Sequence, residues 1–92
     1  MAWATARHIL VDTEERCNEI KAEIEGGLDF GEAAQANSNC PSKAQGGDLG
    51  KFGPGQMVPE FDQAIFSGDV GVLYGPIQTQ FGYHLIDITG RG

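Results

Sequence analysis

Apolar positions near the start of the chain change from a strand-like to a helix-like pattern. Residues 5–11 are rich in β-forming side chains toward their end and predict a strand. Asp12 and Glu15 then have the spacing of a capping box. The apolar positions that follow recur at helical intervals, at Cys17, Ile20 and Ile24. The pattern stops at Gly26-Gly27, so a helix is predicted between Asp12 and Gly26.

The middle of the chain predicts a short helix, a loop and a short strand. Asp29 is placed to cap the helix. Its apolar side is formed by Phe30, Ala33 and Ala34. Residues 37–47 have the composition of a loop, in which a single helical turn can follow Pro41. Residues 48–52 then predict a strand bounded by glycines.

The last part of the chain predicts one helix and two strands. Residues 53–55 form a Gly-Pro-Gly turn, and Pro59 suits the first turn of a helix. Residues 68–75 predict a loop that leads to a short strand around Ile77 and Thr79. Residues 81–89 predict the final strand. Alternation places His84, Ile86 and Ile88 on one face of that strand and Tyr83, Leu85 and Asp87 on the other.

This order of elements predicts an α+β fold. Helices that are segregated from the strands cover a small, mostly antiparallel sheet in such folds. The chain has 92 residues, which predicts one domain spanning residues 1–92.

The charge distribution disfavours polyanionic partners. The net charge is −7, and eight of the thirteen acidic residues lie between Asp12 and Glu32, opposed only by Arg16 and Lys21. Because binding to phosphates needs a basic surface, we expect neither nucleic acid nor an anionic membrane as the main partner. The simplest interpretation of the acidic stretch is a solvated helix face.

No apolar run approaches the roughly 20 residues of a membrane span, and the first residues lack the pattern of a signal peptide. These absences predict a cytoplasmic location, with Cys17 and Cys40 as reduced thiols. A disulfide between the two cysteines, and a piece of a larger exported protein, are the alternatives left open.

The two histidines of the chain have the same kind of setting. RHIL (7–10) and TQFGYH (79–84) each place a histidine inside a strand-like run. Strands distant in sequence are often neighbours in a sheet, so His8 and His84 can meet beneath one pocket. The segment NCPS (39–42) offers the thiol of Cys40 between them. Two imidazoles and a thiol are sufficient polar groups for a small active site.

Several separated motifs resemble the parvulin-type peptidyl-prolyl cis/trans isomerases. They are RHILV (7–11), NSNCPSKAQGG (37–47), GGDLGKFGPGQM (46–57), Phe61, Phe66 and GPIQTQFGYHLI (75–86). The resemblance runs from about Arg7 to the end of the chain. It implies four antiparallel strands surrounded by about four helices. It also implies catalysed rotation about the peptide bond before proline, with no metal and no cofactor.

The resemblance also implies roles for individual residues. His8, Cys40, Thr79 and His84 would form the catalytic polar set, in which the paired histidines fix each other's tautomers. Leu49, Met57 and Phe61 would line the proline pocket, and Gln56 and Phe81 would contact the substrate. The family carries either cysteine or aspartate at the position of Cys40, which favours an electrostatic role. Covalent attack by the thiolate is the alternative mechanism.

One departure from the family concerns specificity. Members selective for phosphoserine or phosphothreonine before proline carry a basic cluster just after the first strand. Here residues 12–16 are Asp-Thr-Glu-Glu-Arg, whose carboxylates would repel a phosphate. We therefore predict no requirement for phosphorylation and a preference for apolar or basic residues before proline.

The expected partners are proline-containing peptides and unfolded or folding proteins, bound by a monomer. A parvulin-like binding or chaperone module with little catalysis is the alternative function. A Cys/His hydrolase lacks a visible oxyanion-hole motif, and a zinc site lacks paired ligand spacing.

Overall fold

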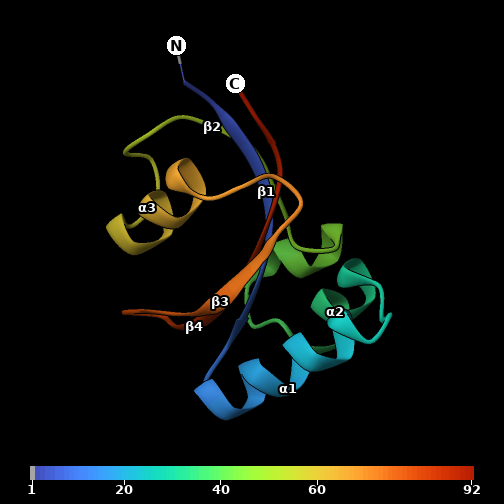
Figure 1. Cartoon of the computed structure of the whole chain (residues 1–92). Coiled ribbons are helices and arrows are strands. Elements are labelled where there is room, and N and C mark those ends of the chain that lie inside the picture. Colours follow the sequence, from blue (N-terminus) through green and yellow to red (C-terminus); the bar gives the residue numbers. More distant parts are fainter. Residues whose placement is uncertain (1) are drawn as a thin grey trace.

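Four antiparallel strands form one sheet in the order β2-β1-β4-β3 in the computed structural model, which describes residues 2–92 (Figure 1). The strands are β1 (Ala4–Val11), β2 (Asp48–Phe52), β3 (Leu73–Thr79) and β4 (Gly82–Arg91). The helices are α1 (Glu14–Glu25), α2 (Phe30–Asn37), α3 (Pro59–Ser67) and the 3-10 helix η1 (Pro41–Gln45). The predicted α+β class and antiparallel sheet are confirmed, with η1 as the fourth helix around the sheet.

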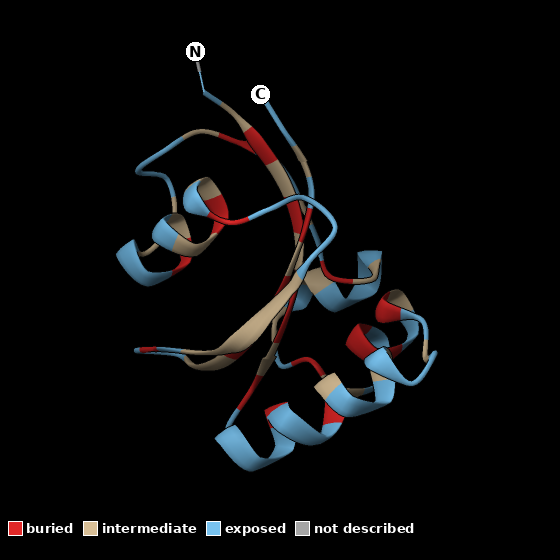
Figure 2. Cartoon of the chain, viewed as in Figure 1, coloured by how far each residue is buried: buried red, intermediate tan, exposed pale blue. Residues whose placement is uncertain are grey.

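The helices cover the two faces of the sheet unequally. Figure 1 shows α3 alone on one side, and α1 and α2 together on the other. Residues with even numbers in β1 and β4 pack toward α3, in a cluster that contains Ala4, Ala6, Ile86, Ile88, Phe61 and Ile65. Odd-numbered residues pack toward α1 and α2, in a cluster that contains Ile9, Val11, Leu85, Cys17, Ile20 and Phe30. The buried residues of α1, α2 and α3 belong to these two clusters, whereas η1 has no buried residue (Figure 2). The predicted alternation along residues 83–88 is therefore confirmed.

The ends of several elements differ from the prediction. The N-cap of α1 is Thr13, whose side chain accepts the Arg16 N–H, so the predicted cap at Asp12 was one residue early. The strand β3 begins at Leu73, inside the predicted loop 68–75, because Leu73 pairs with Asp87 on the long strand β4. Pairing with a neighbouring strand thus outweighs the local glycine signals. The strand β4 runs from Gly82 to Arg91, and Phe81 lies in the turn before it.

Other predicted boundaries agree with the structure. Asp29 caps α2 by accepting the Glu32 N–H, and Pro59 begins α3. The helical turn after Pro41 is η1. None of the helices described within residues 2–92 is long and apolar enough to span a membrane.

Candidate active site

The first and last strands bring the two histidines together. In the pairing of β1 with β4, His8 lies opposite Ile86 and Leu10 lies opposite His84, so both histidines project from the same face. The distance from His8 Nδ1 to His84 Nδ1 is 3.1 Å. His84 Nε2 lies 2.7 Å from Thr79 Oγ1, at the end of β3. A continuous hydrogen-bond chain therefore crosses three strands.

Burial keeps both imidazoles neutral. His8 is 5% exposed and His84 is 3% exposed. Burial, reinforced by the nearby His84, lowers the pKa of His8 from 6.5 to about 4. Burial also lowers the pKa of His84, although Glu60 opposes the change. The Phe61 ring contributes to this dry setting, since its centroid is 5.3 Å from each imidazole centroid.

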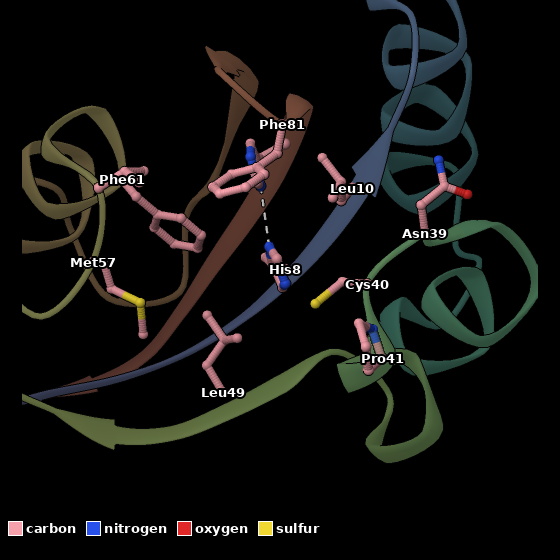
Figure 3. Close-up of a pocket in the computed structure, with 11 residues that line it drawn as sticks. His8, Leu10, Asn39, Cys40, Pro41, Leu49, Met57, Phe61 and Phe81 are labelled. Carbon is pink, nitrogen blue, oxygen red and sulfur yellow. Dashed lines mark hydrogen bonds between the residues drawn. The ribbon is translucent and has the colours of Figure 1, made fainter.

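We expect one pair of tautomers for the two rings. Thr79 Oγ1 accepts the backbone N–H of Phe81 at 3.1 Å, and we expect it to donate its own proton to His84 Nε2, which lies 2.7 Å away. His84 then carries its proton on Nδ1 and donates it to Nδ1 of His8. His8 consequently carries its proton on Nε2. This buried nitrogen has no hydrogen-bond partner among the described residues, and Figure 3 shows it on the side of Cys40.

An apolar cavity of about 360 Å³ lies directly above this chain. It lies between β2, the loop that carries Cys40, α3 and the β3–β4 turn (Figure 3). Its lining residues are His8, Leu10, Asn39, Cys40, Pro41, Leu49, Met57, Val58, Phe61, Phe81 and His84. The size and lining are those of a small-ligand site, with a few polar groups in an apolar wall.

The cavity gathers all but two of the predicted site residues. Thr79 lies beneath it and acts through His84. Gln56 lies outside: its Oε1 accepts the Gly53 N–H at 2.8 Å, and its side chain lines a separate hollow beside Trp3 and Lys51. Phe81 stands at the rim and is 60% exposed, so it is available to a bound chain. The functional role of each of these residues stays a prediction.

Four residues of the lining were missed: Leu10, Asn39, Pro41 and Val58. Each is at most two positions from a residue that was predicted, so proximity to those motifs is the only sequence signal that could have found them.

A pair of glycines lets the Cys40 loop approach β1 closely. The backbone N–H of His8 donates to the Gly47 carbonyl at 3.0 Å. Gly47 has φ +89°, and a Cβ there would lie 2.5 Å from the His8 carbonyl oxygen. Only glycine fits this contact. The GGD motif therefore holds the end of the loop beside the first histidine.

The thiols differ in their surroundings, and neither forms a disulfide. Cys17 is fully buried in α1, and burial raises its pKa to about 11. Cys40 is partly exposed in the cavity wall, where the Ser42 hydroxyl donates to its sulfur at 3.3 Å. Cys17 is therefore a core residue, as predicted. Within residues 2–92, no three or more His, Cys, Asp or Glu side chains gather in a metal-binding arrangement.

Known proteins share this fold over nearly the whole chain. The model of the rotamase family, described as the PPIC-type PPIASE domain, matches residues 6–90. The chain belongs to this family. A solved structure of NmPin, the parvulin of Nitrosopumilus maritimus, superposes with a TM-score of 0.86 at 34% identity and covers 98% of each chain.

Longer relatives share the same domain. The foldase protein PrsA of Geobacillus kaustophilus is 45% identical over 87 residues, which are 94% of this chain and 31% of the relative. The crystal structure of the peptidylprolyl isomerase PrsA from Bacillus anthracis superposes with a TM-score of 0.96 at 40% identity, over 99% of this chain and 42% of that one. The chain thus spans about a third of the curated relatives it matches.

Proposed function

We propose that this domain accelerates cis/trans isomerisation of Xaa–Pro bonds in peptides and folding proteins. The observation that supports it most is the neutral chain Thr79–His84–His8 lying directly beneath an apolar cavity. Proline is the one residue with an apolar ring bonded to its own amide nitrogen. A dry pocket with a polar floor can hold that ring while it presents hydrogen-bonding groups to the amide.

The cavity suits the physical demands of the reaction. Rotation about the amide costs about 18–20 kcal/mol because conjugation is lost. A twisted amide is less polar than a planar one. An apolar environment therefore raises the free energy of the planar amide more than that of the twisted amide, which lowers the barrier between them. Lowering the barrier by about 6 kcal/mol would give roughly four decades of rate. Met57, Phe61 and Leu49 would grip the ring, and the fixed imidazoles need no reorganisation during the twist.

The proposed mechanism is non-covalent. Burial lowers the pKa of the His8 imidazole to about 4, so this ring is a weak base toward the thiol proton. Cys40 would therefore act as a polar group near the substrate carbonyl. The variant Cys40→Asp should keep activity within about tenfold of the original chain. Loss of all activity in a folded Cys40→Asp variant would support covalent attack instead.

The acidic segment after β1 supports the absence of a phosphate requirement. Asn39 lines the cavity, and its Nδ2 donates to Asp12 Oδ1 at 3.1 Å, which places this carboxylate beside the cavity rim. A phosphate carrying nearly two charges would meet that carboxylate. A serine-proline peptide should react faster than its phosphorylated twin, and an alanine-to-lysine change before proline should not slow the reaction. Faster turnover of the phosphopeptide would contradict this specificity.

The principal test is direct. Exchange NMR on a short alanine-proline peptide, with the intact chain added in catalytic amounts, should show cis/trans exchange far above the spontaneous rate. Line broadening from binding without faster exchange would favour the alternative, a binding or chaperone module with little catalysis. The exposed Phe81 at the cavity rim is the feature that favours this alternative.

The remaining features are proposed on the same basis. We propose that the domain acts as a monomer on unfolded chains, without metal or cofactor, and that nucleic acid and membranes are not its partners. The net charge of −7 supports the last point. The free thiols Cys17 and Cys40 support a reducing compartment such as the cytoplasm.

A further inference from the structure

Ser38 joins the Cys40 loop to the first strand through a single buried oxygen. Its Oγ accepts the backbone N–H of Leu10 at 3.0 Å and the backbone N–H of Cys40 at 3.3 Å. Ser38 is 3% exposed. Its own backbone N–H donates to Ala34 and so ends α2. Three parts of the fold therefore meet at one residue: β1, α2 and the loop that carries the thiol.

The Ser38 hydroxyl accepts the backbone hydrogen bond that a neighbouring strand would otherwise accept from Leu10. The strand β2 pairs with β1 only as far as Arg7, so Leu10 has no strand partner on that side. Its N–H is satisfied by Ser38 Oγ, and its carbonyl accepts the Asn39 N–H at 2.7 Å. Backbone groups at a buried strand edge need such partners. The segment 38–39 thereby continues the sheet edge beside Leu10, two residues beyond His8.

We propose that Ser38 is a positioning residue that sets the location of Cys40 relative to His8; this inference rests on the proposed prolyl isomerase function. Cys40 is held at its backbone by Ser38, while the Ser42 hydroxyl contacts its sulfur. Both Leu10 and Cys40 line the cavity. Removing the shared acceptor leaves two backbone donors without partners and loosens the cavity wall at the thiol. A misplacement of about 1 Å in such a wall can cost on the order of a hundredfold in rate.

The variant Ser38→Ala tests the proposal against Ser67→Ala, which removes an exposed hydroxyl at the end of α3. Ser38→Ala should lower kcat by at least about tenfold and change KM by less than about threefold. Alkylation of Cys40 by iodoacetamide should become faster, while Cys17 stays protected. The buried Cys17 is the internal control, because it reacts only when the whole fold opens.

Other outcomes overturn the inference. Kinetics and Cys40 alkylation equal to those of Ser67→Ala would mean that the hydroxyl positions nothing. Equal acceleration of alkylation at both cysteines would mean that Ser38 stabilises the whole fold rather than the loop.

If Ser38→Ala does not fold, hydrogen exchange on the original chain tests whether Ser38 holds both Leu10 and Cys40. The amides of Leu10 and Cys40 should then share similar protection, and an unprotected Cys40 amide would contradict the proposal. If the original chain shows no isomerase activity, the proposed function fails, while alkylation and hydrogen exchange still test the role of Ser38.

Discussion

Lowering the pH from about 7 to about 4 should destabilise the fold through His8, by on the order of 3 kcal/mol in all. Burial, with a smaller contribution from His84, lowers the pKa of His8 from 6.5 to about 4 in the folded chain. Between these two pKa values the unfolded chain binds more protons than the folded one. The contribution of His8 to stability is therefore fully present above pH 6.5 and is lost as the pH falls. Each pKa unit corresponds to about 1.4 kcal/mol, which gives the magnitude.

The assay is urea unfolding of the original chain and of the variant His8→Gln at several pH values across this range. Glutamine removes the titrating group, and the carboxylates of the surface remain as a shared background. The difference between the two chains should shrink as the pH falls, because only the original chain loses the contribution of a buried neutral imidazole. Parallel pH dependence of the two chains would refute the assignment of His8 as a buried neutral group.

Three further predictions follow from the site. Gly47→Ala should lower the free energy of unfolding by roughly 3 kcal/mol or more, because the new Cβ would clash with the His8 carbonyl. The control Gly50→Ala, also at positive φ but in open space, should lower it by about 1–2 kcal/mol. Equal losses for the two variants in urea unfolding would contradict the close approach of Gly47 to β1. Thr79→Val should lower kcat/KM about tenfold by leaving His84 Nε2 without its partner, and the exposed Thr89→Val is the control in the same peptide assay. Met57→Ala should raise KM for proline peptides several-fold with little loss of stability, and an unchanged KM would remove this residue from the pocket.

Elements with local signals were predictable from the sequence. Gly26-Gly27 ends α1, Asp29 caps α2 and Pro59 begins α3, because each signal acts on backbone within one turn of itself. Alternation along residues 83–88 identified the two faces of β4 and placed His84 on the face that carries His8. The resemblance to a known family then supplied the residues of the site.

Features that depend on tertiary pairing were not predictable. The start of β3 at Leu73 depends on Asp87 of β4, which local glycines do not reveal. The position of Gln56 outside the cavity depends on a hydrogen bond to Gly53 within its own loop. The pairing of Leu10 with His84, which places Leu10 at the cavity, joins two strands that are distant in sequence.

The central claim is that two neutral imidazoles with defined tautomers form the floor of the cavity. Long-range proton–nitrogen NMR of the histidine rings at about pH 7 tests it most directly. The account predicts two neutral rings, with the proton on Nε2 of His8 and on Nδ1 of His84. A charged ring, or the reversed pair of tautomers, would contradict it.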